Sequence, residues 1–192
     1  KDFSGLRTSL LERIYNLVQD LHKKNIYTIA RVSVFQDMAF VKARPELALQ
    51  KNNGQEGLWR DNNGLFWLDP GSKEVLDYTV GVAKDAFSRG FDEVNFDYIR
   101  FPSDGDLATI KFPIRDDKKS KAEVIGEAFA HLRSNLPNKK ISVDLFGLAT
   151  VSRDDLGVGQ IIEGAFMNFD YVCPMLYPSH FVEGFLTFKN PA

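Results

Sequence analysis

The chain has 192 residues and a formal net charge of −2, and its hydrophobic and charged fractions of 44% and 26% are ordinary for a folded domain. Its Lys and Arg residues are scattered and form no basic patch, so we expect no nucleic-acid partner. The single cysteine, Cys173, excludes an intrachain disulfide, and no apolar run approaches the ~20 residues of a membrane-spanning helix.

The first half of the chain predicts a helix, a strand, a long irregular segment and a second helix. Apolar residues recur at helical spacing over 6–21, and the β-branched stretch 25–35 indicates a buried strand. Residues 36–71 hold the turn signals KNNGQEG, DNNG and LDPG. A segment of roughly 35 residues is too long for a plain connection, and we expect it to be functional. The second helix, over 76–87, should end at Gly90.

The second half of the chain continues the alternation of strands and helices. In order, the pattern predicts a strand over 92–100, a charged loop, a helix over 124–132, a strand over 140–149 and a strand over 169–178. Before the last strand, Ser152 and Asp155 form a Ser-x-x-Asp pattern, which predicts the start of one more helix.

Alternation of this kind predicts an α/β fold with a parallel sheet and helices outside it. Polar residues gather where the strands end, at Asp97, Asp144 and Tyr177, and sites in α/β folds form at that edge. No glycine-rich phosphate loop follows a strand, so a nucleotide-binding fold is disfavoured. A (β/α)₈ TIM barrel fits better, although such barrels typically have ~250 residues. With about four strands visible, we expect residues 1–192 to form a single barrel domain that is incomplete and truncated at both ends.

Four stretches carry a resemblance to a known family: IYTIARVSVFQD, the segment from Trp67 to Gly105, ISVDLFG and DYVCPMLYPSHF. Together they resemble a bacterial family of glycoside-hydrolase-like domains long catalogued as a domain of unknown function, itself similar to the α-amylase-like TIM-barrel hydrolases. The resemblance spans nearly the whole chain, and the strings FDYIRFP and PMLYPSH are its specific part. It implies a carbohydrate substrate, cleavage of a glycosidic bond in a poly- or oligosaccharide, and an extracellular or cell-surface location. No signal peptide is recognised, and no metal or other cofactor is expected because ligand clusters are missing.

Two carboxylates are the catalytic candidates. Alternation places Glu93, Asn95 and Asp97 on one face of their strand, with Asp97 at the rim. Asp144 interrupts an apolar run, so it must be paired, protonated or in contact with a wet cleft. Carboxyl groups ~5–5.5 Å apart would favour retention and ~6.5–9.5 Å inversion, and neighbouring strands allow both.

The resemblance makes Asp97 the nucleophile or the stabiliser of the oxocarbenium-like state, and Asp144 the acid/base. Two alternatives stay open. Asp97 could instead be the structural partner of Arg100 or Arg31, and Asp144 could hydrogen-bond a sugar hydroxyl. Arg31, in the middle of its strand, is expected to be buried and paired with Asp97 or Glu93.

Six further residues are candidates for substrate binding. Arg100 begins the loop after its strand and could clamp a carboxylate or simply order that loop. The others offer aromatic faces, hydroxyl groups or charges at strand ends and in loops: Asp37, Trp67, Tyr98, Tyr177 and His180. Cys173 is expected to be buried within its strand.

Two other functions stay open for the same barrel. A non-catalytic carbohydrate- or cell-wall-binding domain would keep the cleft without turnover. A metal-dependent lyase or aldolase is weaker, because no ligand cluster and no obvious Schiff-base lysine is present. A second carboxylate facing Asp97 across a cleft would favour the enzyme, whereas Asp97 sealed in an arginine pair would favour the binding domain. The sequence makes no prediction of the oligomeric state.

Overall fold

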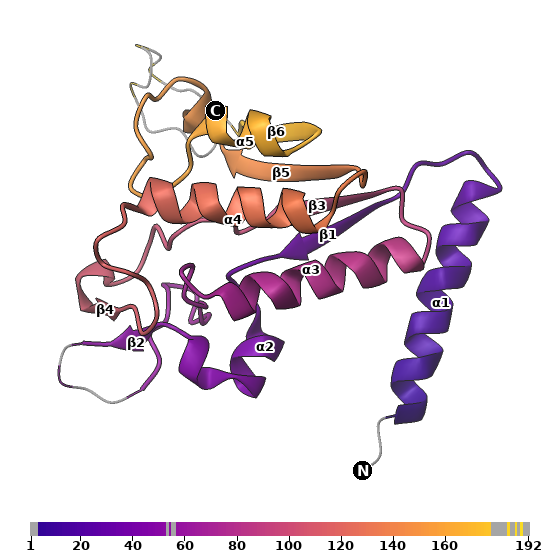
Figure 1. Ribbon diagram of the computed structural model, residues 1–192, viewed down its shortest axis with the longest axis horizontal. Coiled ribbons are helices and arrows are strands. Elements are labelled where there is room, and N and C mark those ends of the chain that lie inside the picture. Colours follow the sequence, from indigo (N-terminus) through magenta and orange to yellow (C-terminus); the bar gives the residue numbers. More distant parts are fainter. Residues whose placement is uncertain are drawn as a thin grey trace.

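The computed structural model describes residues 4–52, 54, 57–177, 184, 187 and 189, and of residues 4–9 only the backbone. A parallel sheet lies at its centre, with helices along it (Figure 1). The helices are α1 (Ser4–His22), α2 (Met38–Ala43), α3 (Lys73–Ser88), α4 (Lys121–Asn135) and α5 (Ile162–Asn168). The strands are β1 (Ile29–Ser33), β2 (Gln50–Lys51), β3 (Glu93–Asp97), β4 (Ile110–Lys111), β5 (Ile141–Phe146) and β6 (Tyr171–Met175). Short 3₁₀ turns cover Pro45–Leu47, Leu107–Thr109 and Gly147–Thr150.

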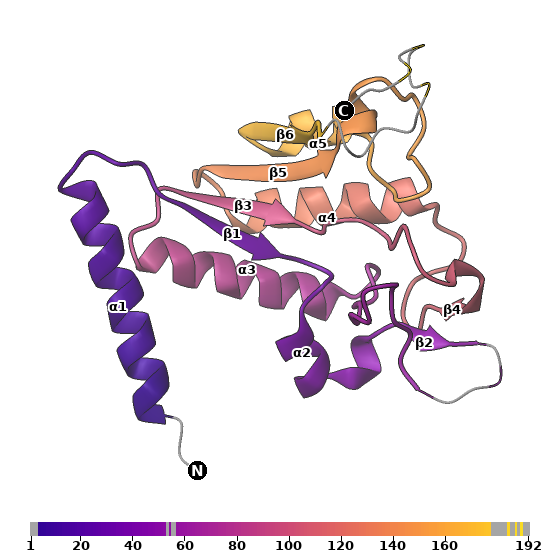
Figure 2. The same cartoon turned by 180° about the vertical axis from the view of Figure 1, so that it is seen from behind.

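The central sheet has the strand order β1-β3-β5-β6, and every neighbouring pair is parallel. Helix α3 packs against β1 and β3, α4 contacts α3 and α5, and α5 packs against β6. Helix α1 stands beside the end of the sheet at which the strands begin (Figure 2). This is the βα alternation of an incomplete (β/α)₈ barrel, as the sequence predicts, and the sheet of the described residues is not closed. No helix in the described ranges is long and apolar enough to cross a membrane.

Strand β3 divides into an apolar and a polar face, as its alternation predicts. Val94 and Phe96 are fully buried, and the Phe96 ring meets Phe169 edge to face at 6.2 Å, on the side that the helices cover. Glu93 and Asn95 face the other way, where both hydrogen-bond to the Ser142 hydroxyl on β5. The apolar face therefore anchors β3 in the core, while the polar face is presented to the inside of the barrel.

The segment between β1 and α3 contains short regular elements, which the expectation of an irregular stretch over 36–71 missed. The segment contains α2 and β2, and β2 pairs with β4 in a small antiparallel sheet. The Asp61 carboxylate holds the turn that follows by accepting backbone N–H bonds from Asn63 and Leu65. Trp59 and Trp67 are 2% and 1% exposed and belong to the same hydrophobic core as the central sheet and its helices.

The helix predicted after Ser152 is also wrong. Ser152 caps no helix; its hydroxyl instead bonds to the Asp154 carboxylate. Gly157 and Gly159 have φ values of 68° and 86°, which a helix cannot contain, and the Gly159 Cβ position would meet the Lys121 backbone. Helix α5 consequently starts only at Ile162, without a side-chain cap.

Cys173 is exposed, although we expected it to be buried. Within the part of the chain that the structure describes, β6 is an edge strand with β5 on one side only. A strand with two neighbours, such as β3, is buried along its whole length, whereas β6 is partly exposed throughout. Cys173 is exposed because of the position of its strand in the sheet, which the sequence of the strand does not show.

Helix α4, which leads into β5, begins with a capping box made by Ser120 and Glu123. Ser120→Ala removes the side-chain oxygen that accepts the Glu123 N–H, and we expect it to lower the free energy of unfolding by about 1 kcal/mol. Urea denaturation followed by circular dichroism measures this change. Ser134→Ala, an exposed site in the last turn of the same helix, is the control and should change stability much less. Equal effects of the two substitutions would contradict the assigned role of the cap.

Candidate functional site

The register of β3 and β5 brings two carboxylates together at the end of the sheet. The pairs run from Val94–Ile141 to Phe96–Val143, so the next residue on each strand is Asp97 and Asp144. Each acid lies two residues beyond Asn95 or Ser142, which hydrogen-bond to each other at 3.1 Å. Both carboxylates therefore belong to the polar face, at the carboxyl end of the strands, where sites form in barrels of this type.

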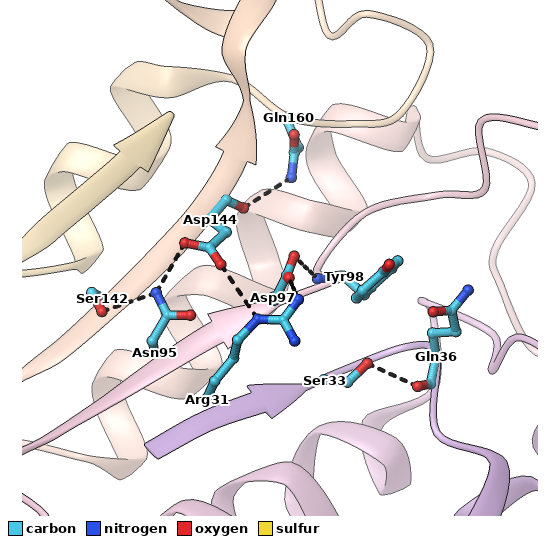
Figure 3. Close-up of polar contacts among 9 residues, drawn as sticks. All are labelled: Arg31, Ser33, Gln36, Asn95, Asp97, Tyr98, Ser142, Asp144 and Gln160. Atoms are coloured by element: carbon cyan, nitrogen blue, oxygen red, sulfur yellow. Dashed lines mark hydrogen bonds and ion pairs between the residues drawn. The ribbon is translucent and has the colours of Figure 1, made fainter. Parts of the chain in front are cut away.

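One guanidinium group links the two acids. Arg31 on β1 donates from Nη2 to the Asp97 carboxylate, and its Nε lies 3.8 Å from Asp144 Oδ2 (Figure 3). The expected pairing of Arg31 with Asp97 is confirmed, but the expected burial of Arg31 is wrong, since its side chain is 61% exposed. The reason is that β1 lies at the edge of the sheet formed by the described residues, with β3 on one side only.

Asp97 is held firmly at the point where β3 ends. It is 4% exposed, and its Oδ1 accepts the backbone N–H of Tyr98 at 2.6 Å. Tyr98 has a φ of 52°, a left-handed conformation that is uncommon for a residue with a side chain. Such conformations cost free energy and gather at functional sites. Here the turn aims the Tyr98 amide at the carboxylate and fixes the orientation of that carboxylate.

Asp144 occupies a different electrostatic environment. Burial raises the pKa of its carboxyl group, the hydrogen bond from Asn95 lowers it, the neighbouring Asp97 charge raises it and Arg31 lowers it, with a net upward shift. The Asn95 side-chain amide donates to Asp144 Oδ1 at 3.1 Å. A carboxyl group with a raised pKa keeps its proton to higher pH, and a pair of acids in unlike environments is typical of acid/base sites.

Gln160, which the sequence analysis did not select, locks the end of β5. This side chain is buried, accepts the Phe146 N–H at 2.9 Å and donates to the Ile99 carbonyl at 3.4 Å. It also approaches the Asp144 carbonyl at 3.5 Å (Figure 3). It thus ties the loop after β5 to the ends of β3 and β5. No local pattern could have revealed it, because its partners lie far away in the sequence.

A cavity of about 540 Å³ opens beside Asp97, within the usual size of a small-molecule site. Three of the predicted binding residues line it: Tyr98, Arg100 and Tyr177. Its wall also includes Arg31, Phe146, Gly147, Leu148 and Met175. Of the residues that were missed, Phe146 could have been found, because it lies two positions after Asp144 on the same face of the strand. Met175 could not, because only the pairing of β5 with β6 brings it beside Phe146.

Two other candidates, Trp67 and Asp37, do not line this cavity. Trp67 is buried, and its indole N–H donates to the Asp61 carboxylate at 3.0 Å, so it offers no free face to a sugar. Asp37 caps α2 by accepting two backbone N–H bonds, and its other oxygen accepts the Tyr78 hydroxyl. His180 lies outside the described residues. In the described ranges, no three His, Cys, Asp or Glu side chains gather as a metal site requires.

Arg100 is buried in the wall of the cavity, with 8% of its surface exposed. Its guanidinium group lies over the Phe146 and Trp67 rings, at 4.6 and 4.9 Å from their centroids. Nη1 donates to the Phe101 carbonyl and to the Ser103 hydroxyl. Arg100 therefore does order the loop after β3, but through hydrogen bonds and ring contacts; none of the described carboxylates forms an ion pair with it.

With this geometry, comparison with known proteins is informative. A family model described as "Putative glycosyl hydrolase domain" matches residues 2–192. The chain belongs to this family. No curated protein matches it.

Solved structures share the fold. A hypothetical protein from Ruminiclostridium thermocellum ATCC 27405 is 35% identical, with a TM-score of 0.62, over 76% of this chain and 67% of that chain. The α-galactosidase TtGalA from Thermus thermophilus, solved with stachyose, is 14% identical over 83% of this chain, with a TM-score of 0.54. Ega3 of Aspergillus fumigatus, solved with galactosamine, is 14% identical over 82% of this chain, with a TM-score of 0.51. The match spans only 30% of the TtGalA chain and 54% of the Ega3 chain.

The environment of Asp144 predicts a pH-dependent effect on stability. A raised pKa means that the folded state binds this proton more tightly than the unfolded state. The free energy of unfolding therefore falls as pH rises from the ordinary carboxyl range through the raised pKa. Above that pKa the folded wild-type protein bears the full free-energy cost of a charged Asp144 carboxylate. The Asp144→Asn variant has no such charge, and its side-chain oxygen can still accept the hydrogen bond from Asn95. We expect the variant to have the higher urea midpoint at about pH 8, with the advantage lost at about pH 3.

Asp154→Asn is the matched control with the opposite sign. The pKa of Asp154 is lowered by hydrogen bonds from the Ser152 hydroxyl and the Leu156 amide, so its charged form stabilises the fold. The Asp154→Asn variant should therefore lose most stability, relative to the wild type, at high pH. If Asp144→Asn also loses stability at about pH 8, the assigned environment of Asp144 is wrong.

Proposed function

We propose that this domain hydrolyses a glycosidic bond in a poly- or oligosaccharide, with Asp97 and Asp144 as its pair of carboxylates. One observation carries the proposal: the register of β3 and β5 sets the two acids side by side on the polar face of the sheet, and Asp97 lines a cavity of about 540 Å³. Two carboxylates on either side of the scissile bond are the usual machinery of glycosidases. Membership of a glycosyl hydrolase family and a fold shared with an α-galactosidase support the same class of reaction.

In this mechanism Asp97 is the nucleophile, or the anion that stabilises the oxocarbenium-like transition state. It lines the cavity, so its oxygens can face the anomeric carbon of a bound sugar. Arg31 and the Tyr98 amide both donate to it, and these two donors hold the carboxylate in place before substrate arrives. A fixed anion beside developing positive charge stabilises the transition state without reorganisation.

Asp144 supplies the proton for the leaving group. Its raised pKa favours the protonated form that a general acid needs at the start of the reaction. Its side chain is 17% exposed, which leaves a route for exchange of the proton with solvent. Once the bond has broken, the same carboxylate can accept a proton from the attacking water.

The aromatic residues of the cavity suit a sugar ring. Tyr98, Phe146 and Tyr177 all line it, and the apolar C–H face of a sugar packs against such rings. Tyr177 is 52% exposed and therefore accessible from solvent.

A non-catalytic carbohydrate-binding domain is the second candidate, and the pairing of both acids with Arg31 favours it, because a carboxylate in an ion pair is a weaker nucleophile. Turnover distinguishes the two functions. Oligosaccharide binding without cleavage by the wild-type protein would support the binding domain.

Asp97→Asn tests the first role. The substitution keeps the shape of the side chain and removes its charge, so we expect cleavage to fall to background while the thermal unfolding transition persists. Release of reducing ends from a panel of polysaccharides, together with chromogenic glycosides, measures the cleavage. Asp117→Asn removes a charge from an exposed loop residue and should leave cleavage unchanged. Full activity of Asp97→Asn would remove this residue from the mechanism.

Asp144→Asn tests the acid. We expect kcat on a polysaccharide to fall roughly 10²- to 10⁴-fold, and far less on an aryl glycoside whose leaving group needs no proton. Because the acid works in its protonated form, wild-type kcat should decline as pH rises through the raised pKa, and the variant should lack this alkaline decline. An equal loss of kcat on both kinds of substrate would show that Asp144 donates no proton.

A further inference from the structure

One edge of the Arg100 guanidinium has no partner within the described part of the chain. Nη1 is occupied by the Phe101 carbonyl at 3.0 Å and the Ser103 hydroxyl at 3.2 Å. Nε and Nη2, on the other edge, bond to no described residue, yet neither is among the buried polar atoms that lack a partner. Both atoms therefore keep access to solvent, and Arg100 lines the cavity.

The positive charge of Arg100 is not neutralised by a contact. Burial lowers its pKa, and the carboxylates of Asp97, Asp104 and Asp61 act on it only from beyond ion-pair distance. Asp97, the carboxylate that shares the cavity with it, is already paired with Arg31. A buried cation without an anion costs free energy, so binding of a negatively charged group beside Arg100 would be favourable.

Aromatic rings hold this guanidinium in one orientation. The centroids of Phe146, Trp67 and Tyr98 lie 4.6, 4.9 and 5.4 Å from its central carbon. Trp67 is itself fixed through its bond to Asp61. Rings over the faces of a guanidinium leave its N–H groups directed outward in its plane. The free Nε–Nη2 edge is therefore a preorganised fork of the kind that binds a carboxylate or a phosphate through two parallel bonds.

We propose that the cavity selects a saccharide with an anionic substituent, and that Arg100 binds this substituent through Nε and Nη2. The planar carboxylate of a uronic acid matches the fork, and sulfate and phosphate esters share its chemistry. The inference rests on the proposed function for its saccharide, and it names the substrate class of that same site. Arg100 is then the residue that sets specificity, while Asp97 and Asp144 act on the bond.

Matched polymers test the substrate class. Polygalacturonate, alginate and a glucuronate-rich polymer are each compared with their own carboxyl-reduced form, which keeps the linkage and loses the charge. Isothermal titration calorimetry with the full chain and oligosaccharides of each type measures binding, and reducing-end release measures cleavage. We expect at least one charged form to bind about tenfold more tightly than its reduced partner, which corresponds to about 1.4 kcal/mol. Sulfated and phosphorylated oligosaccharides are tested in the same way. If the preference for their charged form over the uncharged one exceeds that seen with the carboxylated polymers, the anionic substituent is a sulfate or phosphate ester.

Variants tie the preference to this residue. Arg100→Gln should abolish the difference between charged and reduced forms, mainly by raising KM for the charged one. Arg100→Lys keeps the charge without the fork and should restore part of the preference, and it serves as the second variant if Arg100→Gln does not fold. Arg60→Gln is the control, because Arg60 also stacks on a ring, at 4.2 Å from the Phe66 centroid, but lies outside the cavity.

The outcomes separate this inference from the proposed function. Equal binding and cleavage of charged and reduced polymers would overturn the anionic substrate and leave the hydrolase standing. Arg100-dependent binding of a charged oligosaccharide with no cleavage of any polymer would support the anion site and overturn the hydrolase. A preference for the charged form that Arg100→Gln and Arg100→Lys both retain in full would overturn the role of Arg100.

Discussion

The parallel pairing of β3 with β5 is the constraint on which the site depends. It sets Asp97, the last residue of β3, beside Asp144, near the carboxyl end of β5, on the polar face of the sheet. A shift of one residue on either strand would turn one acid toward the helices and into the apolar core. The pairs that Val94 and Phe96 make with β5, together with the burial of both side chains, therefore stabilise the fold and align the acids at once.

The two arginines of the cavity have different electrostatic surroundings. Arg31 lies on β1, at the edge of the sheet that the structure describes, and forms ion pairs with both acids, which offsets part of the repulsion between them. Arg100 lies in the wall, held by rings and by the loop after β3, and has one edge free. Both arginines line the same cavity, together with Asp97.

Two local features at the carboxyl edge of the sheet lower the stability of the fold. Tyr98 adopts a left-handed conformation, and Asp144 keeps a carboxyl group in surroundings that raise its pKa. Both features oppose folding, and both lie at the carboxyl edge of the sheet. The buried apolar residues of β3 and the capped start of α4 lie outside the cavity and offset them.

The sequence by itself determined the alternation of strands and helices, the two faces of β3 and the positions of Asp97 and Asp144 on their strands. These features depend on side-chain periodicity within single elements, which is local information, whereas the catalytic role predicted for the two acids depends on the family resemblance. Only the tertiary structure decided that Cys173 is exposed, that Trp67 lies behind the cavity and that Gln160 locks the end of β5. Burial and hydrogen-bond partners of this kind depend on strand order and on contacts between residues far apart in the chain, and no local pattern encodes them.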